Sequence, residues 1–156
     1  MSETLSPPEF SLTLSLGEHS GMTDTANANR ALILDAYERM FAGESEALAG
    51  LLDPDVLFAE AESLPYGVTV RGIAGARQGV AKMFTAWRSL AVEIHEFTAA
   101  GDLVIAYLTM KGVGRETADV YEGMTAEVFR LNDGKIIEWR PIYWDTHRVR
   151  QVCGPA

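Results

Sequence analysis

The second half of the chain predicts a β-sheet built from consecutive strands. Apolar and polar residues alternate there with the period of two that is typical of strands, over the segments 91–100, 103–112, 119–131 and 135–144. Gly101-Asp102 separates the first two segments and Asn132-Asp133-Gly134 the last two, and both are turn sequences that join hairpin strands. Two consecutive hairpins favour a mostly antiparallel sheet.

The first half of the chain adds helices and two shorter strands. Apolar residues spaced three and four apart predict helices over about 27–43, 45–52 and 73–90. Short apolar runs predict strands over about 55–61 and 68–71. This order of elements predicts an α+β fold, in which helices pack on one face of a curved, mostly antiparallel sheet.

The two ends of the chain differ from this central part. Within residues 1–21, apolar and polar residues alternate over 10–16, and Met22 opens a polar run that looks like a second beginning. One interpretation makes 1–21 an extension outside the domain, and the other makes it an arm that adds an edge strand to this or a partner subunit. The predicted domain spans 22–150, and 151–156 are expected to form a C-terminal tail.

Charge and composition exclude several classes of partner and site. The chain of 156 residues has a net charge of −9, which argues against binding to nucleic acid or to an anionic membrane. No apolar run approaches the roughly 20 residues that span a bilayer. Cys153 is the only cysteine and is interpreted as a bystander thiol. Residues 1–21 contain no Lys or Arg to start a secretory signal, so the expected location is the cytoplasm.

No cofactor or metal is expected from the motifs. His19, His95 and His147 lie far apart and share no ligand spacing, and no glycine-rich loop leads from a strand into a helix. The aromatic side chains of Trp139 and Tyr143, each with a polar tip, suit a pocket for an apolar ligand, so the expected binding partner is a small apolar molecule.

The stretch 54–67 carries the strongest chemical signal. Alternation places Glu60 on one strand face with Val56 and Phe58, so its carboxyl group lies at the end of an apolar strand. Burial of a carboxylate is unfavourable and raises its pKa, which would make Glu60 a proton acceptor near neutral pH. The alternative is an ordinary rim carboxylate, solvated or paired with Arg71 or Arg77.

The region from about residue 27 to 149 resembles the nuclear transport factor 2-like superfamily, which includes ketosteroid isomerase, SnoaL-like polyketide cyclases and limonene epoxide hydrolase. The resemblance implies a cone-shaped, cystatin-like α+β barrel. It rests on the runs Ala42-Gly43-Glu44, Leu51-Leu52-Asp53-Pro54-Asp55-Val56, Leu64-Pro65-Tyr66-Gly67, Arg71-Gly72, Phe129-Arg130-Leu131, Asp133-Gly134-Lys135-Ile136 and Glu138-Trp139-Arg140-Pro141.

The same resemblance implies roles for individual residues. The catalytic aspartate of ketosteroid isomerase falls on Glu60, and its protonated oxyanion-hole aspartate falls on Glu127. Its oxyanion tyrosine falls on Ala36, one residue from Tyr37, and the acid/base aspartate of the cyclases falls on Pro141. Both carboxyl positions are therefore kept, whereas the tyrosine and the cyclase aspartate are missing.

From these arguments Glu60 is expected to be the base and Glu127 the acid or oxyanion donor. Glu127 shares a strand face with Thr125 and Phe129, and the alternative for it is a salt bridge to Arg140 or Lys111. Asp145 is a further acid/base candidate or a strand-end cap. The expected ligand-binding residues are Tyr37, Phe58, Tyr66, Phe84, Trp87, Phe129, Trp139 and Tyr143, for which core packing is the alternative.

Two functions remain open at this point. The first is a cofactor-free isomerase or cyclase that moves a proton on a small apolar carbonyl or polycyclic compound. The second is a non-catalytic module of the same fold that binds a small ligand or dimerises. In either case both faces of the strand 103–112 carry apolar residues, which favours a homodimer.

Overall fold

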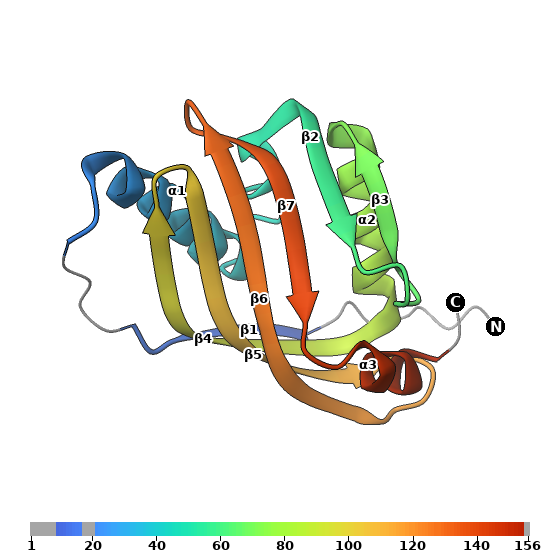
Figure 1. Cartoon of the computed structure of the whole chain (residues 1–156). Coiled ribbons are helices and arrows are strands. Elements are labelled where there is room, and N and C mark those ends of the chain that lie inside the picture. Colours follow the sequence, from blue (N-terminus) through green and yellow to red (C-terminus); the bar gives the residue numbers. More distant parts are fainter. Residues whose placement is uncertain (1–8, 17–20, 155–156) are drawn as a thin grey trace.

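The computed structural model describes residues 9–16 and 21–154, which form three α-helices, a 3-10 helix and seven strands (Figure 1). In chain order the elements are β1 (Glu9–Leu14), α1 (Asp24–Phe41), η1 (Ala49–Leu51), β2 (Leu52–Glu60), β3 (Val68–Arg71), α2 (Ile73–Ala86), β4 (Trp87–Ala100), β5 (Leu103–Gly114), β6 (Val120–Asn132), β7 (Lys135–Tyr143) and α3 (Thr146–Cys153). The expected α+β fold is confirmed.

The strands form one sheet in the order β1-β4-β5-β6-β7-β2-β3. Neighbouring strands run antiparallel except in the pairs β1–β4 and β2–β7, which are parallel. The sheet is strongly curved (Figure 1). Its edge strands β1 and β3 do not pair with each other, so the sheet stays open instead of closing into the expected barrel.

The helices α1 and α2 cover the inner face of the curved sheet and lie behind it in Figure 1. Helix α1 packs on β4 and β5, whereas α2 packs on β2, β3 and β4. The inner face of β5 therefore meets mainly α1. Helix α3 lies at one end of the sheet against β5 and β6.

Both predicted hairpins are present, because their turn residues have the backbone conformations that tight turns need. Gly101 has φ of 60° between β4 and β5, and Ala100 pairs with Leu103 across this turn. Between β6 and β7, Asp133 and Gly134 have φ of 47° and 74°. Positive φ at both central residues is the requirement of the hairpin turn that Asp-Gly favours.

The predicted helix over 73–90 is too long, because its last residues belong to β4. Trp87 pairs with Gly114 and Leu90 with Gly112, so ladder formation with β5 decides their conformation. The ring of Trp87 lies over Gly112, where a Cβ atom would be 2.5 Å from the Trp87 ring. Tertiary packing of this kind overrides local helix propensity.

The other helices also differ from prediction at their ends. Helix α1 begins three residues earlier than expected, because the Thr23 side chain accepts a hydrogen bond from the Ala26 amide as N-cap. The helix predicted over 45–52 is reduced to the single turn η1, since Leu52 already belongs to β2.

The C-terminal segment forms the helix α3, which the sequence analysis did not predict. Asp145 is its N-cap and accepts a hydrogen bond from the Arg148 amide at 2.9 Å. Val152 and Cys153 are buried by this helix, so residues 151–153 are packed against the domain. Burial raises the pKa of the Cys153 thiol to about 12, which keeps it uncharged.

The strand β1 comes from the N-terminal segment and extends the sheet of its own subunit. It pairs in parallel with β4 from Glu9 opposite Ser89 to Leu14 opposite Ile94. None of its six residues is buried, although Leu12 and Leu14 pack against the core.

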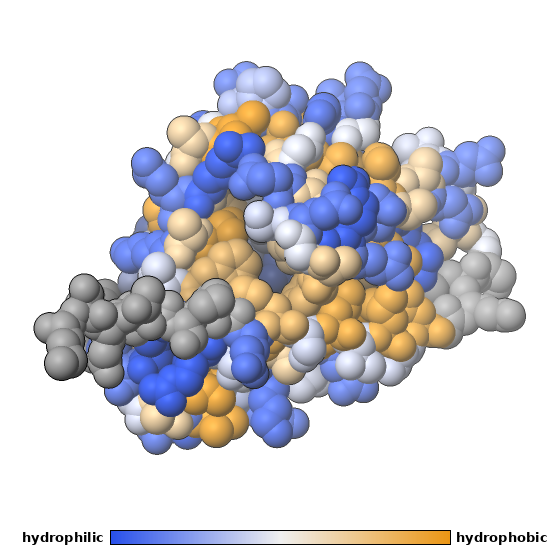
Figure 2. Space-filling view, turned by 180° about the vertical axis from the view of Figure 1, so that it is seen from behind, coloured by the Kyte–Doolittle hydropathy of each residue, from blue (hydrophilic) through white to orange (hydrophobic). Residues whose placement is uncertain are grey.

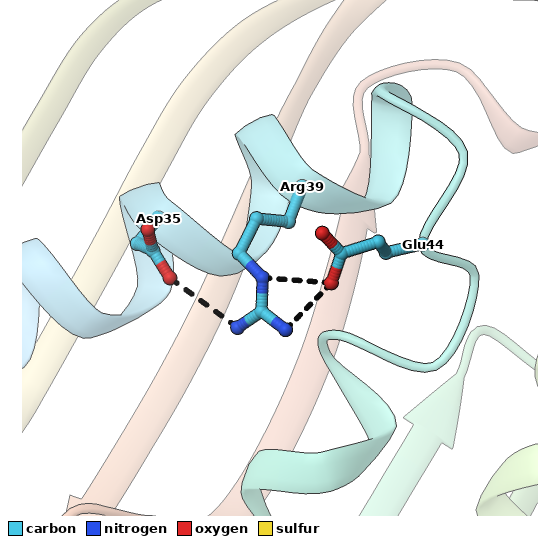
Figure 3. Close-up of polar contacts among 3 residues, drawn as sticks. All are labelled: Asp35, Arg39 and Glu44. Carbon is cyan, nitrogen blue, oxygen red and sulfur yellow. Dashed lines mark hydrogen bonds and ion pairs between the residues drawn. The ribbon is translucent and has the colours of Figure 1, made fainter.

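The loop after α1 is tied to the helix by exposed charges. Arg39 donates two hydrogen bonds to Glu44, at 2.9 and 2.6 Å, and also contacts Asp35 at 3.5 Å (Figure 3). Exposed ion pairs of this kind contribute about 0–1 kcal/mol each, so their main effect is to position the loop. The last turn of α1, which this loop follows, carries Met40 and Phe41.

Candidate functional site

An apolar pocket lies between the inner face of the sheet and the two covering helices. Its cavity volume is about 90 Å³, and Figure 2 shows the surface hollowed between hydrophobic residues on the helical side. The lining residues are Phe10, Tyr37, Met40, Phe41, Phe58, Glu60, Val80, Met83, Phe84, Leu90, Val92, Leu108, Met110, Thr125, Glu127, Trp139, Pro141 and Tyr143. This volume is below the roughly 300–1,000 Å³ of typical small-molecule sites.

Glu60 is the last residue of β2 and is almost completely buried, with 3% of its surface exposed. Its Oε2 atom has no hydrogen-bond partner. Desolvation, followed by repulsion from Glu127, raises the pKa of Glu60 from an ordinary value of 4.5 to about 9. The Glu60 carboxyl group is therefore protonated at neutral pH.

The alternative of a paired or solvated Glu60 does not hold. Arg77 instead pairs with Glu46, at 2.6 Å between Nη2 and Oε2. In the part of the chain that the structure describes, no ion pair joins Glu60 to Arg71 or to any other cation. An uncompensated buried carboxyl group is rare in proteins because its ionised form is strongly disfavoured.

Glu127 lies on β6 and is half-buried, with its exposed part facing the pocket that it lines. The indole Nε1 of Trp139 donates a hydrogen bond to its Oε2 at 2.6 Å. Burial raises the pKa of Glu127 to about 7, and the hydrogen bond from Trp139 opposes that shift. Near neutral pH this carboxyl group is therefore close to its titration midpoint.

The alternative of a salt bridge for Glu127 is also wrong. Arg140 pairs with Glu138 on its own strand, and Lys111 lies 3.7 Å from Glu122 on the outer side. Both carboxyl groups of the pocket thus lack a neutralising cation.

Strand register explains how the two carboxyl groups come together. Glu127 lies opposite Pro141 on β7, and Phe58 lies opposite Trp139 on the other side of β7. Because β2 and β7 are parallel, Glu60, two residues after Phe58, lies beside Pro141, two residues after Trp139. The two glutamates therefore flank β7 at one level, on either side of Pro141, and all three residues line the pocket.

Tyr37 supplies a hydroxyl group to the same pocket from α1. Its ring meets the edges of Phe97 and Phe129, each with centroids 6.1 Å away. Desolvation and then the nearby Glu127 raise the pKa of Tyr37 well above its ordinary value, so the hydroxyl stays neutral. Although Ala36 occupies the position implied by the family resemblance, the neighbouring Tyr37 faces the pocket.

Tyr66 and Tyr143 form a buried pair at the end of the pocket. The Tyr66 hydroxyl donates to the Tyr143 hydroxyl at 3.2 Å, and only Tyr143 lines the cavity. Burial raises the pKa of both side chains well above the ordinary value, so both remain neutral donors.

The pocket brings together seven of the eleven site residues predicted from sequence, namely Glu60, Glu127, Tyr37, Phe58, Phe84, Trp139 and Tyr143. Tyr66 and Phe129 support its wall from behind, through the bond to Tyr143 and a stack on Trp139 at 5.6 Å. Trp87 is buried beside Tyr121 and Gly112 away from the cavity. Asp145 caps α3 and also lies outside the pocket.

Sequence reasoning did not select the remaining lining residues as site residues. Thr125 shares the inner face of β6 with Glu127, and this alternation was a usable signal. Met40, Phe41 and Val80 lie on helix stripes that predicted only packing. The alternation of apolar and polar residues predicted a strand at Phe10, but nothing in the sequence predicted that this strand lies beside the pocket.

The described residues contain no group of three or more His, Cys, Asp or Glu side chains that could hold a metal ion. Nor does any helix among residues 9–16 and 21–154 have the length and apolar character needed to cross a membrane.

Comparison with known proteins places this fold and pocket in a family. Solved structures with the same fold include an NTF2-like protein from Burkholderia thailandensis, 23% identical, with a TM-score of 0.73 over 81% of this chain and 98% of the other. A candidate SnoaL-like polyketide cyclase from Jannaschia sp. CCS1 is 17% identical, with a TM-score of 0.73 over 88% and 100%. TerC co-crystallised with polyporic acid is 21% identical, with a TM-score of 0.69 over 80% and 97%.

These identities are low, so the structural likeness shows the fold alone. No curated protein matches the sequence. The model of the SnoaL-like domain family, however, matches residues 33–139, which is well over half of the chain and includes Tyr37, both glutamates and Trp139. The chain therefore belongs to the SnoaL-like domain family.

Proposed function

We propose that the pocket binds a small, mainly apolar carbonyl compound and that the protein moves a proton on it, as in isomerase- or cyclase-type reactions. The observation that carries this proposal is the pair Glu60 and Glu127, two carboxyl groups in one apolar pocket without a cation. Strongly perturbed carboxyl groups in a pocket are typical of functional sites. TerC, which shares the fold, was co-crystallised with polyporic acid, which supports a small organic ligand here.

The hydrogen bonds favour different protonation states for the two glutamates. An indole N–H can only donate, so its bond to Oε2 of Glu127 favours the ionised form of that carboxyl group. Oε2 of Glu60 has no donor to stabilise a negative charge. Between about pH 7 and pH 9 the pair therefore holds one proton, and Glu60 keeps it.

This distribution reverses the roles expected from sequence. The Glu127 carboxylate accepts a proton from the carbon beside the substrate carbonyl, the electron pair of that C–H bond forms a carbon–carbon double bond, and the π pair of the carbonyl moves to its oxygen. The neutral Glu60 acid donates a hydrogen bond to the resulting enolate oxygen. Return of the proton from Glu127 to another carbon completes an isomerisation, and no cofactor takes part.

The test is exchange of the acidic hydrogens of 2-tetralone, a bicyclic ketone, into deuterated water, followed by proton NMR. We expect a bell-shaped rate, which rises through about pH 7 as Glu127 ionises and falls above about pH 9 as Glu60 loses its proton. The double variant Glu60→Gln/Glu127→Gln measures the exchange that the solvent alone produces.

Two results would contradict this assignment in different ways. A rate that rises only above about pH 9 would return the role of base to Glu60. A rate equal to that of the double variant at every pH would remove the proton-transfer function altogether.

A second function, ligand binding without chemistry, is favoured by one specific observation. Oγ1 of Thr125 and Oε2 of Glu60 are both buried without a hydrogen-bond partner. Such atoms can hold the polar group of a ligand while no proton moves. Saturable binding of 2-tetralone, with exchange no faster than in the double variant, would support this function.

We also propose that the protein forms a homodimer through the outer face of the sheet. This face is uncovered in Figure 1 and exposes the large apolar side chains Tyr107, Ile142 and Trp144. They line a shallow uncharged depression with Met124 and Ala126, in a protein whose net charge is −9. A second copy offers the same uncharged surface, as a twofold interface requires.

The change Ile142→Glu places a charge in the middle of that interface and is expected to give a monomer. Sedimentation velocity at micromolar concentration should show a dimer for the wild type and half that mass for the variant. Gln78→Glu adds the same charge to the exposed side of α2 and should leave the dimer intact. A monomeric wild type would contradict the proposed dimer.

A further inference from the structure

We infer that β1 is a displaceable wall of the pocket and that Phe10 on it contacts the apolar end of the ligand. This inference rests on the proposed function only in taking the pocket as the ligand site. It concerns how a ligand enters and which side chains select it, and not the chemistry of Glu60 and Glu127.

The first observation is the position of Phe10. Its ring lies 4.9 Å from that of Phe84 on α2, at an angle of 57°, and both side chains line the pocket. Phe10 pairs with Leu90 and Leu12 with Val92, so the inner-facing residues of β1 continue the pocket wall that β4 begins.

The second observation is the separation of chemical character within the pocket. Its ionisable side chains come from α1, β2, β6 and β7, whereas the contributions from β1, α2 and β4 are Phe10, Val80, Met83, Phe84, Leu90 and Val92, all apolar. A ligand whose carbonyl group reaches the glutamates therefore places its hydrocarbon part against Phe10 and Phe84. Apolar surface on that part is what this wall recognises.

The third observation is that β1 is weakly attached. It is an edge strand that pairs with β4 alone, and although Leu12 and Leu14 pack against the core and the strand touches α1, all six of its residues keep solvent exposure. Phe10 itself is 37% exposed although it lines the cavity. Elements with few buried contacts open at low free energy, well before the domain unfolds.

The ladder between β1 and β4 spans the whole of β1, from Glu9 opposite Ser89 to Leu14 opposite Ile94. Beyond Leu14, the Ser15 amide donates to the carbonyl of Ile94 at 2.9 Å and its hydroxyl donates to Glu93 at 3.4 Å. Displacement of β1 at Phe10 uncovers Phe84, Leu90 and Val92 to an entering ligand.

The test uses N-phenyl-1-naphthylamine, an uncharged apolar fluorophore, in equilibrium titrations and stopped-flow measurements on the full chain. Phe10→Ala is expected to weaken its affinity about tenfold and to speed its dissociation, because a ring contact is lost. Thr13→Ala, an exposed change on the opposite face of the same strand, should stay within about twofold of the wild type. Equal affinities and rates for the two variants would overturn the contact with Phe10.

A reversible cross-link tests displacement directly. Ser11 and Ala91 are paired across β1 and β4, and neighbouring strands lie about 4.8 Å apart, which suits a disulfide between Ser11→Cys and Ala91→Cys. In the oxidised protein, association and dissociation of the fluorophore should both slow at least about tenfold, and reduction with dithiothreitol should restore them. Unchanged rates in the oxidised protein would show that β1 does not move.

The outcomes separate this inference from the proposed function. If the fluorophore responds as expected while 2-tetralone exchange does not exceed that of the double variant, the displaceable wall stands and the proton transfer fails. If the wild type binds no fluorophore, the pocket is not a site for apolar ligands and the inference fails with it.

Discussion

Replacing Glu60 with glutamine is expected to stabilise the protein at pH 7 by about 3 kcal/mol, although the change removes a side chain that we place in the site. The folded protein holds a proton on Glu60 up to about pH 9, whereas the unfolded chain releases it near the ordinary value of 4.5. Since pH 7 lies about 2.5 units above the pKa of Glu60 in the unfolded chain, keeping the proton in the folded state lowers the stability by roughly 1.4 kcal/mol for each of these units. Glutamine is neutral at every pH and avoids this cost.

The sign of the effect gives it a characteristic pH dependence. Between the two pKa values the folded state binds one more proton than the unfolded state, so rising pH favours unfolding. Wild-type stability should therefore fall from about pH 5 to pH 9, and Glu60→Gln should remove the part of that slope that belongs to Glu60. Below pH 4.5 both states of the wild type are protonated at this position, and the two proteins should be about equally stable.

Urea unfolding at pH 4, 7 and 8.5, followed by circular dichroism, measures this difference. Glu62→Gln is the matched control, because it makes the same chemical change two residues away on an exposed side chain. It should alter the stability by less than about 0.5 kcal/mol at each pH. A Glu60→Gln protein that is no more stable than the wild type at pH 8.5 would falsify the assignment of a buried, protonated Glu60.

The sequence was informative wherever local pattern decides the structure. The two hairpins follow from alternation and from the turn residues at Gly101 and Asp133-Gly134, which few other conformations accommodate. The burial of Glu60 and the inward position of Glu127 follow from the same period of two. Family resemblance added the pairing of the two glutamates, which lie far apart in the sequence.

The remaining features depend on contacts between distant segments. Trp87 begins a strand because it pairs with Gly114 on β5 and its ring packs over Gly112. The local sequence around Trp87 does not predict this pairing. Helix α3 has only eight residues, and its signal was the spacing of Val149, Val152 and Cys153 behind the cap Asp145.

The site shows the same division between local pattern and distant contact. The bond from Trp139 to Glu127 joins two strands whose register shifts between Arg130 and Leu131. A one-residue change of register would have turned one of the two side chains to the outer face. The protonation pattern that this bond favours, and hence the role of each glutamate, was therefore not available from sequence.

Replacing Glu127 with glutamine is expected to lower the exchange of 2-tetralone at pH 8 by at least about 100-fold, which is the usual effect of losing a general base. The amide has a shape close to that of the acid and can still meet the indole of Trp139, so the pocket should keep its form. The Glu62→Gln protein should exchange at the wild-type rate. If the Glu127→Gln protein retained most of the exchange activity, a group other than Glu127 would be the base.

Trp139→Phe separates the role of the hydrogen bond from the role of the carboxyl group. Phenylalanine keeps an aromatic ring between Phe58 and Phe129 but removes the Nε1 donor that holds Oε2 of Glu127. A hydrogen bond to a charged group contributes about 1.5–3 kcal/mol, so the pKa of Glu127 should rise by about one to two units.

The rate at pH 7 should then fall roughly tenfold in Trp139→Phe and recover as the pH approaches 9, because the base is intact and only its ionisation is displaced. In Glu127→Gln the exchange rate should not recover at higher pH, since the amide side chain does not ionise at any pH. A Trp139→Phe profile that is lowered equally at every pH would mean that Trp139 only shapes the pocket. An acidic limb shifted to higher pH would instead establish that the indole keeps Glu127 ionised beside a protonated Glu60.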